Sequence, residues 1–298
     1  MLSVLIPIFN YDVNHLIASL SEQGKSAGIE FEILCYDDGS LQNIKSLNAG
    51  LEQIDHVVYK EFDMNIGRSR IRNRLANDAK YMALLFMDCD MLIVKNDFLA
   101  KYLKSFEDGY VIVGGVVYDS DKPEDRSKLL RWKYGHEREA LSAQGRSERP
   151  YKSFMSGSFM IDKKVFHDIC FDENISKYGH EDTLFGKELR LRNIPIKHIR
   201  NSLQHIGLES APIFIDKTRH SVENLATLII EKKLDSDVRL VKVFITLKRL
   251  FLTGIMQSLF DQHQEKWLNN LKSEDPSLRK LDLYKLGYLI KCLKEKSI

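Results

Sequence analysis

In the first part of the chain, short apolar runs alternate with longer segments in which apolar residues recur every three to four positions. The apolar runs, rich in β-branched and aromatic residues, lie at residues 3–9, 31–36, 56–62 and 81–88. The segments with helical spacing lie at residues 13–23, 43–54 and 67–79. Strands that alternate with helices at such distances predict an α/β fold in which helices flank a mostly parallel sheet.

The pattern changes after residue 118. Residues 119–150 are polar and irregular, with helical spacing only around 127–137. So long an excursion is typical of a lid or a disordered segment. Strand character returns at 153–166. Beyond residue 217 we expect only helices, at 221–234, 238–260, 263–272 and 281–298. The sequence thus predicts an α/β domain over 1–216, in halves of about 1–118 and 119–216, and a helical region over 217–298.

Charge is unevenly distributed, although the net charge is only +2. The helical region carries 16 Lys/Arg and 10 Asp/Glu, whereas the preceding residues carry 28 and 32. The acidic first part argues against binding to nucleic acid. The four cysteines show no C-x-x-C spacing, the chain opens directly into an apolar strand pattern, and no apolar run is long enough to span a membrane. We therefore expect a cytoplasmic protein with reduced thiols.

Two acidic loops follow predicted strands. Asp88 and Asp90 interrupt an otherwise apolar run, and "DDGS" at 37–40 closes an earlier strand. Ligands of open α/β sheets sit beyond the carboxyl ends of the strands, so both loops are expected at one crevice. Side chains two apart in an extended segment point the same way, so these two carboxylates are suited to one Mn²⁺ or Mg²⁺ ion and a diphosphate. An ordinary turn is the alternative.

Several motifs in this order resemble those of family 2 glycosyltransferases with the GT-A fold. The resemblance covers about residues 1–210, and the motifs are "SVLIPIFN", "YDDGS", "NIGRSRIRN", "FMDCDM", "SGSFMIDKKVF", "FDEN" and "YGHEDTLFG". It implies an inverting enzyme that uses a divalent metal, Mn²⁺ or Mg²⁺, to transfer a sugar from a UDP-sugar to a hydroxyl of a glycan or lipid-linked saccharide. The implied process is surface polysaccharide or glycan synthesis, and GDP- and dTDP-linked donors remain alternatives.

For the nucleotide, the resemblance implies a set of six residues. They are Pro7, Phe9, Asp38, Gly67, Arg72 and Asp88. Pro7 and Phe9 would border the base, Asp38 would accept a hydrogen bond from the uracil or ribose, and Asp88 would reach the ribose. Arg72 would contact the base or the diphosphate, with a solvated helix arginine as the alternative. The glycine would let its loop approach closely.

The metal and the general base follow from the same resemblance. Asp90 and His205 would bind the cation, although most lone histidines are simply buried and hydrogen-bonded. Glu181 and Asp182 would supply the base, and Asp182 is the better match. Its chemical task would be to remove the proton of the acceptor hydroxyl, while the cation neutralises the leaving diphosphate. For both acids the alternative is stabilisation of a helix N-terminus.

Four residues are expected at the donor and acceptor sugars. Gly157 and Ser158 would line the donor pocket, or only start a strand of small residues. His180 would contact one of the sugars. Trp132 would stack on an acceptor ring, or form the apolar face of a short lid helix.

The segment 240–260 mixes large apolar residues with Lys242, Lys248 and Arg249 at helical spacing. Such a helix suits peripheral contact with an anionic membrane, here the inner face of the cell membrane, but equally suits packing on the catalytic domain.

Two other functions are weighed against a transferase. The first is an inactive module that binds a nucleotide-sugar, which would not need the base Asp182. The second is a different enzyme on a similar sheet, a metal-dependent nucleotidyltransferase or phosphohydrolase, which would favour a Gly-rich phosphate loop or a dense set of His and Asp ligands near the first strand. The segment "PIFNYDVN" offers neither.

Overall fold

The computed structural model describes residues 1–175 and 178–296. The chain divides into two compact units that are interleaved along the sequence. The first unit comprises Met1–Asp119, Ala140–Asn174 and Phe185–Gly207. The second comprises Ser120–Glu139, Ile175–Leu184 and Leu208–Ile298.

This division differs from the predicted boundary after residue 216, because buried apolar residues tie two earlier segments to the C-terminal helices. Leu130 shares a core cluster with Ala211 and Ile215. Leu184 shares another with Val222 and Leu225. The second unit is therefore built from three separate stretches of sequence.

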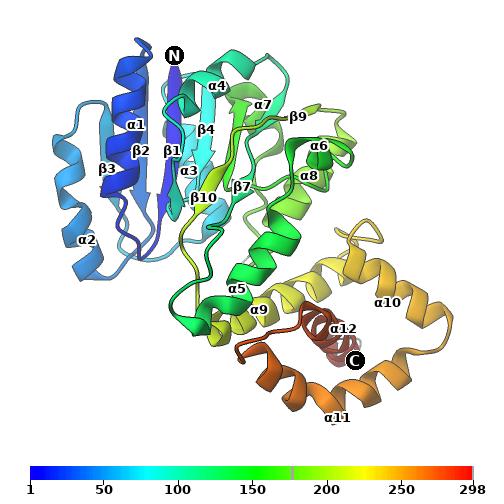
Figure 1. Cartoon of the computed structure of the whole chain (residues 1–298). Helices are drawn as coiled ribbons and strands as arrows, with labels where there is room; N and C mark the ends of the chain where they lie inside the picture. The colour runs from blue at the N-terminus through cyan, green and yellow to red at the C-terminus, as the bar shows by residue number, and fades with distance from the viewer. Residues whose placement is uncertain (176–177, 297–298) are drawn as a thin grey trace. The chain divides into compact units, whose positions relative to one another are not determined.

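The first unit contains a seven-stranded sheet (Figure 1). In spatial order the strands are β3 (Val57–Glu61), β2 (Phe31–Asp37), β1 (Leu2–Ile8), β4 (Ala83–Met87), β8 (Ser158–Asp162), β6 (Val111–Val113) and β9 (Ile196–His198). The first four run parallel, and β9 is parallel to β6. Only β8 is antiparallel to both of its neighbours. The predicted α/β fold with a mostly parallel sheet is confirmed.

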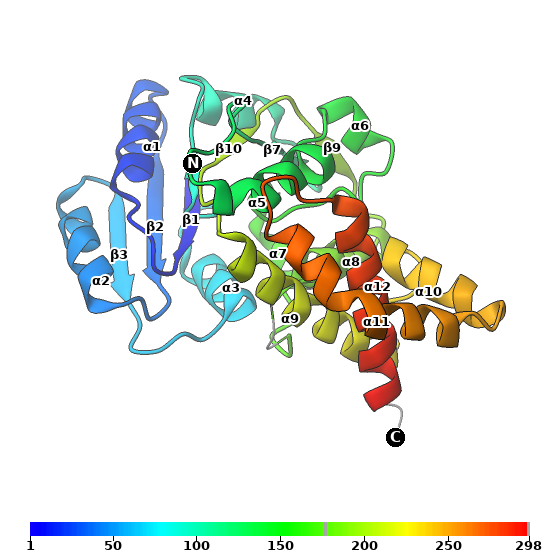
Figure 2. The ribbon, with the colours of Figure 1, turned by 60° about the horizontal axis from the view of Figure 1, so that its bottom comes forward.

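Helices cover both faces of this sheet (Figure 2). The helices are α1 (Asn14–Ser26), α2 (Gln42–Asn48), α3 (Arg68–Asp78), α4 (Phe98–Ser105), α6 (Ala143–Ser147), α7 (Lys163–Ile169) and α8 (Glu181–Leu191). Apolar residues of α3, α7 and α8 share one core cluster with the central strands. Aromatic rings fill it: Phe86 stacks on Phe159 with ring centroids 4.7 Å apart, and Phe171 stacks on Phe185 at 4.5 Å.

A second, three-stranded sheet follows the end of β4. It consists of β5 (Met91–Leu92), β10 (Leu203–His205) and β7 (Val116–Val117). Strand β10 lies between the other two, with His205 opposite Met91. This register brings a distant histidine beside the acidic turn at residues 88–90.

The second unit is helical. It contains α5 (Leu129–Tyr134), α9 (Ala211–Ile230), α10 (Arg239–Arg249), α11 (Thr253–Leu271) and α12 (Leu278–Lys296). A 3₁₀ turn at Arg126–Lys128 precedes α5 and a π turn at Gly135–Glu139 follows it, so the predicted helix in the 119–150 excursion is confirmed. No single helix in the described part of the chain has the length and apolarity of a membrane span, although α10 and α11 reach them jointly across a 118° bend.

The predicted elements are wrong in extent at two places. Residues 153–166 are not one strand, because Asp162 caps a helix there by accepting hydrogen bonds from the N–H groups of Lys164 and Val165. Residues 238–260 are not one helix, because the backbone turns at Leu250–Leu252, and the helix expected at 263–272 is the second half of α11, which begins at Thr253.

Candidate active site

The loops after β1 and β2 are joined by hydrogen bonds in the first unit. Buried Asp37 accepts from the Ser40 N–H at 2.7 Å, and the Asn10 N–H donates to the Ser40 hydroxyl at 2.7 Å. Pro7 lies in β1, and Phe9, directly after that strand, is half exposed. Both expected base-contacting residues thus lie at the carboxyl end of β1, where ligands of such sheets bind.

Asp38 anchors a third loop. Its two carboxylate oxygens accept from the N–H groups of Ile66, at 2.7 Å, and Gly67, at 3.1 Å. Burial raises the pKa of Asp38 above its usual value, although these two hydrogen bonds act in the opposite direction. Gly67 has φ +96° directly before α3, a backbone conformation that glycine adopts readily. Asp38 therefore shapes the entrance to α3, and its contact with a nucleotide stays a prediction.

Arg72 is buried inside the first unit, unlike a solvated helix arginine. Its Nη2 lies 2.6 Å from Asp88 Oδ1, and its guanidinium lies over the Phe171 ring at 5.6 Å. Its Nε and Nη1 are buried and have no hydrogen-bond partner among the described residues. A buried guanidinium with donors to spare suits an incoming phosphate or carbonyl oxygen.

Asp88 and Asp90 lie in a turn between β4 and β5, which differs from the extended segment expected from the sequence. The two carboxylates do not point toward one common ligand: Asp88 pairs with Arg72 and Asp90 pairs with His205. The Asp88 N–H donates to the Gly157 carbonyl at 3.1 Å. A Cβ atom on Gly157 would lie 3.3 Å from Asp88 Oδ2, so this glycine allows the close approach of β8.

Asp90 faces His205, with Oδ2 and Nε2 3.3 Å apart. Burial opposes ionisation of Asp90, but the hydrogen bond and charge of His205, together with Arg68, hold the pKa of this carboxyl below its usual value. A Cβ atom on Gly207 would lie 2.5 Å from Asp90 Oδ2, so the backbone after β10 closes tightly around the carboxylate. His205 Nδ1 is buried without a hydrogen-bond partner in the described residues.

This pair fits a divalent cation by donor type, since Mn²⁺ accepts carboxylate oxygen and imidazole nitrogen. Within residues 1–175 and 178–296, no group of three or more His, Cys, Asp or Glu side chains is arranged to hold a metal ion.

Two neighbours of this pair were not predicted from the sequence. Tyr11 lies close enough that burial, Asp90 and Cys89 together raise its pKa to about 12. Arg68 contributes positive charge at Asp90. Arg68 belongs to the predicted motif "GRSRIRN", but nothing in the spacing distinguishes it from the other arginines there.

Ser158 starts strand β8 as one reading of the sequence suggested. It is buried, and its Oγ lies 2.6 Å from the Tyr102 hydroxyl, which in turn accepts from the Gly114 N–H at 2.9 Å. The hydroxyl of Ser158 is therefore held within the first unit, and its place at a donor sugar stays a prediction.

Helix α8 is shared by the two units, with residues 181–184 in the second and 185–191 in the first. Glu181 and Asp182 occupy its first turn, so the predicted helix start is confirmed. His180 precedes them with φ +73° and its Nδ1 lies 3.3 Å from Thr183 Oγ1. Burial, with a smaller effect from Lys285, lowers the pKa of His180 to about 4. The Gly179 carbonyl accepts a hydrogen bond from the Asn224 side chain of α9, which fixes the chain ahead of the acids.

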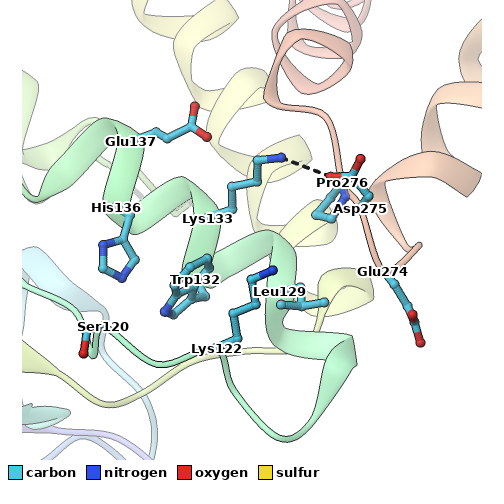
Figure 3. A pocket seen from close by; sticks show the side chains of 10 residues that line it. All are labelled: Ser120, Lys122, Leu129, Trp132, Lys133, His136, Glu137, Glu274, Asp275 and Pro276. Carbon is cyan, nitrogen blue, oxygen red and sulfur yellow. Dashed lines mark hydrogen bonds and ion pairs between the residues drawn. The ribbon is translucent and has the colours of Figure 1, made fainter.

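Trp132 lines a pocket of about 450 Å³ in the second unit (Figure 3). The lining residues are Ser120, Lys122, Leu129, Trp132, Lys133, His136, Glu137, Glu274, Asp275 and Pro276. The rings of Trp132 and His136 lie 4.5 Å apart, and Lys133 Nζ is 3.3 Å from Asp275 Oδ1. An aromatic face with charged groups around it can hold a sugar ring by stacking and hydrogen bonding.

The first unit thus brings Arg72 to Asp88 and His205 to Asp90. The expected approach of Asp182 to these two carboxylates stays a prediction.

Comparisons with known proteins give three kinds of similarity. The model of glycosyl transferase family 2 matches residues 3–170. A chondroitin synthase of Escherichia coli is 23% identical over 219 residues, which cover 63% of this chain and 32% of the relative. The chain spans about a third or less of the length of the curated chondroitin synthases it matches.

Solved structures share the fold at low identity. A crystal structure of residues 1–349 of S. aureus TarS in complex with UDP has a TM-score of 0.50 and 17% identity, covering 98% of this chain and 89% of that one. The mannosyltransferase PcManGT of Pyrobaculum calidifontis, in complex with GDP-Man and Mn²⁺, has a TM-score of 0.54 and 12% identity, covering 99% and 87%.

Proposed function

Because the chain belongs to glycosyl transferase family 2 and has the GT-A fold, we propose that it is a metal-dependent inverting hexosyltransferase. It transfers a sugar from a UDP-sugar to a hydroxyl of a saccharide or lipid-linked saccharide. One observation carries this proposal: a single turn after β4 holds one carboxylate on a buried arginine and a second on a histidine.

The nucleotide end is assigned to the first unit. Asp88 is oriented by Arg72 and takes the ribose, while Arg72 Nε and Nη1 donate to the base or diphosphate. The loops fixed by Asp37 and Asp38 border the base together with Pro7 and Phe9. The TarS complex with UDP, which shares the fold, supports uridine as the base.

Asp90 and His205 would hold Mn²⁺ or Mg²⁺ through one oxygen and one nitrogen. When bound, the cation neutralises charge on the departing diphosphate. To bind the cation, the Asp90 carboxyl must be ionised and the His205 imidazole must be neutral. The PcManGT complex with Mn²⁺ supports a divalent ion on this fold.

Asp182 would accept the proton of the attacking hydroxyl. Its place in the first turn of α8 favours the ionised carboxylate, because the N-terminal end of a helix carries partial positive charge. Glu181 is buried beside it and would support its position. One base and one leaving group suffice for displacement with inversion.

The acceptor is proposed to be a saccharide held in part by the Trp132 pocket, with His180 near one of the sugars. Similarity to chondroitin synthases over 63% of the chain supports a role in polysaccharide synthesis. A cytoplasmic location at the inner face of the cell membrane, with peripheral contact through the basic C-terminal helices, completes the proposal.

A screen of nucleotide-sugars tests this function. Thermal unfolding of the full chain is measured with UDP-, GDP- and dTDP-sugars, each with and without Mn²⁺, and transfer to saccharide acceptors is followed for the best donor. We expect a UDP-sugar to raise the unfolding temperature only with the metal present, and the product to have inverted anomeric configuration. Donor binding without any transfer would instead indicate a binding module. In a separate incubation with a nucleoside triphosphate and a sugar phosphate, formation of a nucleotide-sugar and diphosphate would indicate a nucleotidyltransferase.

A further inference from the structure

The turn between α10 and α11 has an unusual local structure. The Leu252 N–H donates to the Leu247 carbonyl at 2.8 Å, and the Phe251 N–H donates to the Lys248 carbonyl at 3.2 Å. These two bonds form a Schellman motif that ends α10. Its left-handed position normally holds glycine, but here it holds Phe251 with φ +58°. A bulky residue at that position is strained, so the fold would be more stable without it.

The same turn exposes apolar side chains to solvent. Phe251 is 91% exposed, Ile255 59% and Leu250 58%. We call the exposed residues at this bend the apolar knuckle: Leu250, Phe251, Leu252, Ile255 and Leu259. In both overall views the bend protrudes away from α9 and α12, between the golden and orange helices (Figures 1 and 2).

The apolar knuckle is not needed to hold the two helices in place. Val241 and Phe244 of α10 pack into the core of the second unit. Met256 and Phe260 of α11 pack into a neighbouring core cluster. The helices are therefore anchored by their other faces, and the apolar knuckle is surface without an evident role in folding.

Exposed Lys248 and Arg249 directly precede the apolar knuckle. The stretch 238–260 contains two further exposed cations, Arg239 and Lys242 at the start of α10, and no Asp or Glu, while Asp261 directly follows it. Aromatic and aliphatic tips flanked by lysine and arginine match the interface of an anionic bilayer, where apolar groups enter the acyl boundary and cations meet headgroups.

We propose that the apolar knuckle inserts into the surface of an anionic lipid bilayer. The proposal names the surface for the peripheral contact included in the proposed function, and it differs from a helix lying flat, because the 118° bend presents a tip. None of its residues belongs to the candidate active site, so membrane binding and sugar transfer can be measured separately.

Vesicle co-sedimentation of the full chain tests the proposal, with phosphatidylcholine vesicles and with vesicles that also contain phosphatidylglycerol. The variant Phe251→Gly should weaken binding to anionic vesicles about tenfold or more. It should also raise the unfolding temperature, because glycine relaxes the left-handed position. The matched control Leu191→Ser removes a side chain that is 60% exposed on α8 and should leave binding unchanged.

Charge is tested by Lys248→Gln and Arg249→Gln. Each should lower binding to anionic vesicles about fivefold and leave the weaker binding to neutral vesicles unchanged. Transfer to a soluble acceptor should be normal in all of these variants, so loss of transfer bears only on the catalytic proposal.

Three results would overturn the inference. One is the absence of vesicle binding by the unmodified chain, and another is equal vesicle binding by the unmodified chain and Phe251→Gly. The third is a dimer in sedimentation velocity that Phe251→Gly dissociates, which would assign the apolar knuckle to a second copy of the chain.

Discussion

Arg72 is a costly residue to bury, and its partners explain only part of that cost. Its ion pair with Asp88 satisfies one nitrogen, while Nε and Nη1 lack acceptors in the described residues. A buried ion pair contributes little to the free energy of unfolding. Each buried donor without an acceptor lowers that free energy by about 1–3 kcal/mol. Such a local penalty is typical of a site whose missing partner is a ligand.

The base assignment gives a test at one atom. Asp182→Asn keeps the shape of the side chain but cannot accept the hydroxyl proton as a carboxylate does. We expect turnover to fall about 100- to 10,000-fold, while calorimetry shows nearly unchanged affinity for UDP. Glu188→Gln, on the same helix, is the matched control and should retain activity. Normal turnover in Asp182→Asn would remove this residue from the mechanism.

His180 gives a pH test. Its pKa is lowered from 6.5 to about 4 in the folded state, so folding favours the neutral ring. The stability that depends on this neutral ring is complete above pH 6.5 and is lost as the pH falls toward 4. Urea unfolding at pH 7 and pH 5 should therefore show a larger loss for the unmodified chain than for His180→Gln. Equal losses would mean that the ring is not shielded from protonation.

At the scale of elements, apolar runs predicted the strands of the parallel half because those strands are buried on both faces. Helix α3 was also predictable, since Gly67 precedes a helical pattern. The break at Leu250–Leu252 was not, because these three residues are all apolar and the nearest glycine, Gly254, lies inside α11.

The candidate site likewise has one part that the sequence pattern predicts and another that it does not. The acidic turn after β4 could be located from the sequence, since carboxylates interrupt a buried run. Its pairing with β10 could not, because two- and three-residue strands carry no readable period and the histidine lies more than a hundred residues away. Only the family resemblance linked His205 with Asp90, and its role as a metal ligand stays a prediction.

The tight closure of β10 on the turn gives a test at this scale. Gly207→Ala would place a Cβ atom 2.5 Å from Asp90 Oδ2, so either the carboxylate or the strand must shift. We expect Mn²⁺-dependent UDP binding, measured by calorimetry, to weaken about tenfold or more. The control is Gly50→Ala, where the added atom meets nothing within 4 Å. Unchanged binding in Gly207→Ala would argue against Asp90 as a metal ligand.

At the scale of the whole molecule, the division into two units predicts which backbone amides a bound nucleotide protects from hydrogen exchange. The proposed nucleotide and metal contacts all belong to the first unit, in the segments 7–10, 37–40, 65–72, 88–90 and 205–207. Hydrogen exchange with UDP and Mn²⁺ should therefore slow in these segments. Amides of α10, α11 and α12 should exchange as before. Protection concentrated in the C-terminal helices would place the nucleotide elsewhere.

The interleaving of the two units has a consequence for how such chains can be recombined. The C-terminal helices share their apolar clusters with Leu130 and Leu184, which belong to stretches far earlier in the sequence. A chimera that joined residues 1–216 of this chain to the C-terminal helices of a relative would pair Leu130 and Leu184 with apolar side chains from another protein. The two parts of each cluster would then not be complementary in shape. We expect a chimera to fold only when residues 120–139 and 175–184 are exchanged together with the C-terminal helices of the same unit.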